Sequence, residues 1–162
     1  MTPLDSLEAL AVVKAMRDWP WLYPAAAITH IVGFVTLVGS VAVFDLRVLG
    51  LSKRVSVRSL ARHTLPWSWG ALLLVVPTGL LMFAAHAQDL LASRVFQLKM
   101  GLLLAAATNT AIFLTGPWQT VTAWDVDAKA PLAARLSAAL SLALWLAILG
   151  CGRMLAPFSA LP

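Results

Sequence analysis

The stretch Leu22–Phe44, with the sequence LYPAAAITHIVGFVTLVGSVAVF, decides the fold of this chain. It holds no Asp, Glu, Lys or Arg, and it reaches the about 20 residues that an α-helix needs to cross a bilayer. Three further apolar stretches follow, at Trp67–Ala85, Leu98–Trp118 and Leu136–Leu155. The sequence therefore predicts an all-α integral membrane protein, built as a four-helix transmembrane bundle.

The composition supports this prediction. Hydrophobic residues make up 60% of the chain and charged residues 12%, whereas charged residues are about 25% of an ordinary soluble domain. The short connections leave no room for a soluble catalytic domain. We therefore expect an N-terminal interfacial helix over residues 1–20 and one transmembrane domain over residues 21–162. A water-soluble substrate or redox partner must then dock from outside the bilayer.

The N-terminal segment is predicted to lie in the membrane interface. Thr2, Pro3 and Asp5 have the pattern of a helix start. A helix continuing to about Asp18 would be amphipathic but too polar to span the bilayer. Aromatic residues at the predicted membrane boundary follow, beginning with Trp19. The segment lacks the pattern of a removable signal peptide, so we expect the first span to direct insertion.

The net charge of +5 is carried mainly by short connections beside the spans. Five basic residues surround the connection between spans one and two: Arg47, Lys53, Arg54, Arg58 and Arg62. Cytoplasmic loops of membrane proteins carry an excess of Lys and Arg, so this loop is predicted to be cytoplasmic and both termini to lie on the outer face. The charge thus indicates topology rather than a nucleic-acid partner.

The sequence offers little to an independent enzyme. Cys151 is the only cysteine, which excludes an intrachain disulfide, a Cys-x-x-Cys metal site and the usual two-cysteine attachment of c-type haem. No nucleophile–base pair or metal-ligand set stands out. A copper-handling or transport role would need a clustering of Met, His and Cys that the spans lack. We therefore expect an electron-transfer or accessory subunit.

His30 is the most conspicuous polar residue inside a span. It lies eight residues beyond Leu22, hence ~12 Å along the helix, where a polar group is costly. One interpretation makes it an axial ligand of haem b, because neutral imidazole is a usual protein ligand of haem iron. The other makes it a histidine that forms a hydrogen bond between helices. Both interpretations remain open at this point.

Gly33 lies on much the same helical face as His30. The absence of a side chain there offers a notch that would admit a flat macrocycle beside the imidazole. Small residues are also common wherever membrane helices pack closely, so helix packing alone explains Gly33 as well.

His86 is the candidate for a second axial ligand. It lies near the outer end of span two, and counting from Asp45 for span one and from Trp67 for span two places it ~6 Å from the depth of His30. It is also followed by Gln88 and Asp89, as a hydrated boundary histidine would be. His63 is excluded as its partner because the 23 residues between them correspond to ~35 Å of helix.

Two cations are expected near the outer ends of spans three and four, at about the level of the two histidines. Lys99 and Arg153 there would bind haem propionates, a quinone headgroup or lipid phosphates. The alternative is that each extends its charged group to the interface. Asn109, at mid-depth of span three, is expected to form an interhelical hydrogen bond.

Motifs along the whole chain are similar to those of a known family. They are Trp21, Pro24, His30-x-x-Gly33, Asp45-Leu46-Arg47-x-Leu49-Gly50-Leu51, Leu65-Pro66, Gly79, Phe83, Phe96-x-x-Lys99, Asn109, Trp145 and Gly152-Arg153. The chain thus resembles an uncharacterised family of small four-helix bacterial inner-membrane proteins, distantly similar to the copper-resistance D and membrane cytochrome b groups. The resemblance implies a multi-pass protein of the bacterial inner membrane. It places His30, Lys99, Asn109 and Arg153 on positions typical of the family, but not His86.

The leading hypothesis from the sequence is a b-type cytochrome-like electron-transfer subunit that binds haem b. His30 is its first ligand, His86 a candidate second ligand, and Lys99 and Arg153 the partners of the propionates. Such a subunit would serve a larger respiratory or dehydrogenase complex, with other membrane subunits or an outer-face redox partner, and with quinone as an alternative ligand. The competing hypothesis is a cofactor-free structural or assembly subunit of a membrane complex.

Overall fold

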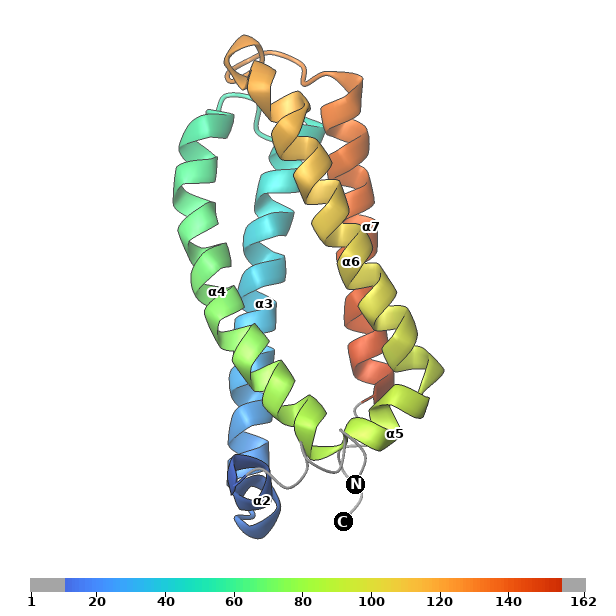
Figure 1. Ribbon diagram of the computed structural model, residues 1–162. Helices are drawn as coiled ribbons and strands as arrows, with labels where there is room; N and C mark the ends of the chain where they lie inside the picture. The colour runs from blue at the N-terminus through green and yellow to red at the C-terminus, as the bar shows by residue number, and fades with distance from the viewer. Residues whose placement is uncertain (1–10, 156–162) are drawn as a thin grey trace. The chain divides into compact units, whose positions relative to one another are not determined.

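The computed structural model describes residues 11–155, and all the regular secondary structure in this range is helical (Figure 1). The elements are α2 (Ala11–Asp18), α3 (Leu22–Leu49), α4 (Val57–Ala85), α5 (Ala87–Ala92), α6 (Arg94–Thr115), the 3₁₀-helix η1 (Pro117–Ala123) and α7 (Leu132–Leu155). The predicted all-α fold is confirmed. The predicted helix start at Thr2, Pro3 and Asp5 lies outside the described residues.

Four of these helices, α3, α4, α6 and α7, are long and apolar enough to cross a membrane. Each overlaps one predicted span, and large apolar side chains on them are exposed, as at Leu73 (77%) and Leu104 (71%). Exposed apolar residues of this size along a helix are expected where lipid replaces water as the solvent. These four helices support the prediction of a multi-pass membrane protein.

Helix α4 begins earlier than the sequence predicted. Span two was expected to begin at Trp67, but α4 already begins at Val57, ten residues earlier. The Ser56 hydroxyl accepts a hydrogen bond from the backbone N–H of Ser59 at 3.0 Å. Such a cap satisfies a backbone donor that has no partner within the helix. Only residues 50–56 therefore connect α3 to α4.

The chain divides into two compact units, which are described separately. Unit 1 comprises Met1–Leu37 and Trp67–Arg94, and unit 2 comprises Val38–Pro66 and Val95–Pro162. In unit 1, Tyr23 meets His86 and His30 meets Thr78. Tyr23 precedes His30 along α3, whereas its partner His86 follows Thr78 along the chain. The two helices therefore run antiparallel in this unit.

Unit 2 contains a continuous apolar core. It draws on segments of α3, α4, α6, η1 and α7, and its buried members are Val48, Val57, Phe113, Val121, Trp124, Ala130, Ala134 and Ala138. The ring of Phe113 on α6 packs edge-on against that of Phe44 on α3, with centroids 5.8 Å apart. Segments of all four long helices thus pack together within this unit.

A buried arginine ties together the loops of unit 2. Arg47 in the last turn of α3 is only 3% exposed. Its Nε donates to the Val55 carbonyl at 2.6 Å, and a terminal nitrogen donates to the carbonyls of Lys53 and Asp125, each at 2.9 Å. We call these three hydrogen bonds the Arg47 clasp. The sequence grouped Arg47 with the basic loop, and the structure corrects this because its donors are used inside the protein.

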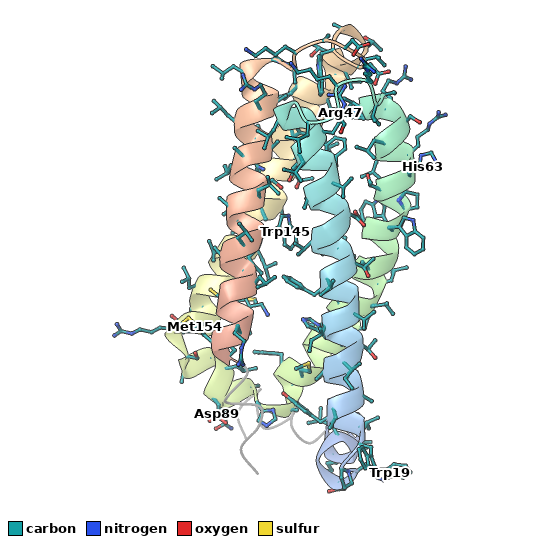
Figure 2. The ribbon with its side chains drawn as sticks, turned by 180° about the vertical axis from the view of Figure 1, so that it is seen from behind. Trp19, Arg47, His63, Asp89, Trp145 and Met154 are labelled. Atoms are coloured by element: carbon teal, nitrogen blue, oxygen red, sulfur yellow. The ribbon has the colours of Figure 1, made fainter. Side chains whose placement is uncertain are left out.

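Asp125 supports the clasp from the other loop. Its carboxylate accepts hydrogen bonds from the Ser56 hydroxyl at 3.0 Å and from the backbone N–H of Arg58 at 2.8 Å. The backbone N–H of Arg58 is the main reason that the pKa of the Asp125 carboxyl lies below its usual value. Burial opposes it, and the Ser56 hydroxyl and the Arg58 charge add smaller lowering effects. The connection between α3 and α4 is thereby fixed to the segment before α7. Figure 2 shows Arg47 at this end of α3.

Candidate functional site

His30 lies half-buried on α3 and is held by a side chain of α4. Its Nδ1 is 3.0 Å from the Thr78 hydroxyl oxygen. That hydroxyl donates its own proton back to the Leu74 carbonyl one turn earlier. Thr78 has no second proton to give, so it accepts the hydrogen bond and His30 Nδ1–H donates it. In the neutral imidazole this arrangement places the lone pair on Nε2.

The two glycines near His30 are in close contact with their neighbours. A Cβ atom at Gly79 would lie 3.0 Å from His30 Cε1, so the imidazole occupies the space that this glycine leaves. A Cβ atom at Gly33 would lie 2.9 Å from Val75 Cγ2 and 3.1 Å from Leu74 Cβ. The notch that Gly33 was expected to offer to a macrocycle is filled by α4. Close helix packing is the role that the structure shows for Gly33.

His86 lies at a different depth of unit 1. It is the residue before α5, and its ring meets that of Tyr23 edge-to-face at 5.4 Å. Thr78, the partner of His30, precedes His86 by eight residues, which corresponds to ~12 Å along a helix. The separation of ~6 Å expected from the sequence was counted from Asp45 and Trp67, whereas α3 and α4 both continue beyond these residues.

The two predicted cations belong to unit 2, whereas His30, Gly33 and His86 belong to unit 1. Lys99 on α6 is half-buried. Arg153 is exposed in the last turn of α7, where a cation interacts favourably with the helix dipole. The expected convergence of these cations with His30 stays a prediction.

Two buried polar contacts link the helices of unit 2. Asn109 on α6 donates to the Ser137 carbonyl at 3.0 Å and accepts from the Ser137 hydroxyl at 2.9 Å. The interhelical hydrogen bond expected of Asn109 is therefore present. Asp45 on α3 is hydrogen-bonded to the Ser141 hydroxyl on α7, one turn from Ser137. The side-by-side course of α6 and α7 in Figure 1 agrees with the first contact.

Sequence reasoning missed Thr78 and Ser141, and it did not consider Asp45 as a site. Hydroxyl residues are frequent in membrane helices, where they bond to their own backbone as Thr36 and Thr108 do here, so neither Thr78 nor Ser141 was conspicuous. Asp45 carried a usable signal, because an acidic residue at the end of an apolar stretch is costly unless it is hydrated or buried with a partner.

Metal binding by clustered side chains has no support in the part of the chain that the structure describes. Residues 11–155 contain no group of three or more His, Cys, Asp or Glu that would hold a metal ion. A haem iron differs, because its porphyrin supplies most of the ligands and one or two protein side chains complete the coordination. His30 remains the donor with the most suitable hydrogen bonding.

The comparisons with known proteins give one family. A model described as a family of unknown function (DUF6644) matches residues 22–159, a range that includes all four long helices. No curated protein and no solved structure matched the chain. The resemblance to a family without an established function is thus supported, whereas the similarity to copper-resistance D and membrane cytochrome b proteins stays a prediction.

Proposed function

The chain belongs to DUF6644, a family of unknown function, and we propose that it is a membrane-embedded, b-type cytochrome-like electron-transfer subunit with His30 as an axial ligand of haem b. The observation that carries this proposal is the hydrogen bond from His30 Nδ1–H to Thr78. Metal-bound histidines typically donate their other ring N–H to an oxygen acceptor, which fixes the ring and directs the lone pair of the remaining nitrogen to the metal.

The residues around His30 fit this role as positioning groups. Gly79 lies against the imidazole edge, and Gly33 brings α3 close to α4 one turn away. A larger residue at either position would displace the ring or separate the helices. A bound haem supplies one-electron redox chemistry, while the chain orients the imidazole through Thr78.

The other elements of the proposal follow from the sequence. His86 is a candidate second ligand, although its register favours a separate role beside Tyr23. Lys99 and Arg153 would neutralise the haem propionates, or a quinone headgroup in their place. The protein would work in the bacterial inner membrane with both termini periplasmic, as part of a larger respiratory or dehydrogenase complex or with an outer-face redox partner.

The proposal is tested by haem content. The full chain, purified in mild detergent from its native membrane, is measured by a reduced-minus-oxidised visible spectrum and by pyridine haemochrome quantification. We expect about one haem per chain, its loss in His30→Ala, and its retention in His63→Ala. His63 is a matched control because it is exposed on α4, where it bonds the Ser59 carbonyl (Figure 2).

A third variant tests the hydrogen bond between His30 and Thr78. Thr78→Val removes the acceptor of the Nδ1 proton but keeps the size of the side chain. We expect this variant to bind haem with a shifted reduction potential, because the hydrogen bond to the ligating imidazole is lost. A colourless wild type, or full haem in His30→Ala, would refute the proposal.

A second function is favoured by the packing contacts. Gly33 against α4 and Asn109 against Ser137 are the contacts of a chain built for close helix association. If the folded wild type is colourless within its purified complex, a cofactor-free structural or assembly subunit becomes the better assignment.

A further inference from the structure

Asp45 is a buried acidic side chain that the proposed electron transfer does not use. It lies in α3, four residues before the helix ends at Leu49, and it is 5% exposed. Its Oδ2 atom has no hydrogen-bond partner in the described structure. The Ser141 hydroxyl, itself on a residue that is 8% exposed, is hydrogen-bonded to the carboxyl group, and this bond must therefore involve the other oxygen.

The surroundings of Asp45 are apolar. Val48 lies on the same face of α3 one turn later and is fully buried. Ala138 precedes Ser141 by one turn of α7 and is 2% exposed. Both belong to the core cluster of unit 2. A carboxylate held in such a place with a single neutral partner would carry a large desolvation cost.

None of the charged groups on the neighbouring helices is bonded to Asp45 Oδ2. On α3, Arg47 directs its donors to backbone carbonyls. On α7, Arg135 stands six residues before Ser141, about 120° away around the helix, and its Nε has no partner. The cations at the start of α4, Arg58 and Arg62, are exposed.

Lys99 on α6 stands further off. It lies ten residues before Asn109, ~15 Å along α6, and Asn109 bonds Ser137, which is one turn from Ser141. With no cation bonded to Oδ2, a bound proton is the remaining way to neutralise this buried carboxyl group.

We propose that Asp45 is a proton-binding site, which takes up one proton from the aqueous side near the α3–α4 loop and holds it as the neutral acid beside Ser141. In this state one carboxyl oxygen carries the proton and donates it to the Ser141 hydroxyl oxygen. The other oxygen, Oδ2, becomes a carbonyl oxygen, and an unpaired buried carbonyl is tolerated far better than an unpaired charge. The end of α3 is ~6 Å away along the helix, which gives a short route to water.

This inference does not depend on haem, so it and the proposed function succeed or fail separately. By binding or releasing this proton, the Asp45 carboxyl group would change its own charge without any change in a bound metal or ligand.

The test is infrared difference spectroscopy of the full chain in lipid nanodiscs. At neutral pH we expect the C=O stretching band of a protonated carboxyl group, shifted in D₂O. The band should disappear in Asp45→Asn, which has the shape of the neutral acid. It should change frequency in Ser141→Ala, which removes its hydrogen-bond partner. Asp125→Asn serves as the matched control and should leave the band unchanged, because the Asp125 carboxylate is held ionised by its donors.

Absence of the band in the wild type, or its persistence in Asp45→Asn, would overturn the proposal. If Asp45→Asn does not fold, the assignment uses the wild type with carboxyl-labelled aspartate. A labelled band that shifts with the isotope at neutral pH supports the proposal, and a labelled sample without a protonated band overturns it.

Discussion

Replacing Arg47 by methionine should destabilise the protein more than any loss of an exposed charge. Methionine keeps much of the apolar stem of the side chain but removes all three hydrogen bonds of the Arg47 clasp. The Val55 carbonyl loses the donor that Arg47 supplies, whereas the carbonyls of Lys53 and Asp125 keep the backbone N–H groups of Asp127 and Val57 as donors. The connection between α3 and α4 is then held to the segment before α7 by the remaining bonds of Asp125 and Asp127.

The magnitude follows from these bonds. A hydrogen bond to a charged group contributes about 1.5–3 kcal/mol. Lys53 and Val55 are exposed residues, so water can replace part of what their carbonyls lose. We therefore expect a loss of about 3 kcal/mol, below the sum of three separate bonds. For a chain of this length, this corresponds to a melting temperature lower by about 6–12 °C.

The chain supplies its own reporter of unfolding. Cys151 is the only cysteine, and it is 6% exposed in the folded protein. A thiol-reactive dye that fluoresces on reaction therefore labels the protein as it unfolds on heating in detergent. The wild type and Arg47→Met are compared under identical conditions, together with Arg58→Met.

Arg58→Met is the matched control because it removes the same charge from an exposed side chain. The backbone N–H of Arg58 that bonds to Asp125 is retained in this variant. We expect its melting temperature to stay near that of the wild type. Equal melting of Arg47→Met and the wild type, or an equal loss in both variants, would refute the stabilising role of the clasp.

Two further predictions test unit 1 and the loops. Gly33→Ala should lower the free energy of unfolding by about 1–3 kcal/mol through overpacking, since its Cβ would lie 2.9 Å from Val75. Gly39→Ala is the control, because a Cβ there would meet nothing within 4 Å, and it should melt at or above the wild type in the same assay. Equal effects of the two substitutions would contradict the packing argument. Asp125 has a lowered pKa through the N–H of Arg58, so its stabilisation is complete above the unfolded value of about 4 and is lost as pH falls through the folded pKa. Circular-dichroism melts of Asp125→Asn should show about 1 kcal/mol less stability at neutral pH and a smaller loss in acid; an unchanged acid profile would contradict this assignment.

His30 illustrates how far the candidate site could be predicted from the sequence. Its depth in the first span and the face that it shares with Gly33 follow from helix geometry alone. Its partner Thr78 does not, because the pairing depends on the register between α3 and α4. The sequence analysis placed the ends of these helices at Asp45 and Trp67, whereas both helices continue beyond these residues. Counting from those ends made His86 appear closer in depth to His30 than it is in the structure.

Arg47 is a residue whose surroundings the sequence did not predict. Positive charge near a span is a sound indicator of topology, and it led the sequence analysis to treat Arg47 as one of five loop cations. The structure buries this residue because carbonyls of two different loops converge on its donors. Its charge alone does not distinguish Arg47 from exposed Arg54 or Arg58, since one of the carbonyls that it binds belongs to the distant Asp125.

The sequence by itself determined that four helices are long and apolar enough to span a bilayer. It did so because the thickness and apolarity of a bilayer restrict both the length and the composition of any segment that crosses it. Only the tertiary structure decided which polar side chains meet: His30 with Thr78, Asp45 with Ser141, and Arg47 with the loop carbonyls. These contacts depend on the register and rotation of one helix against another, which apolar composition leaves open.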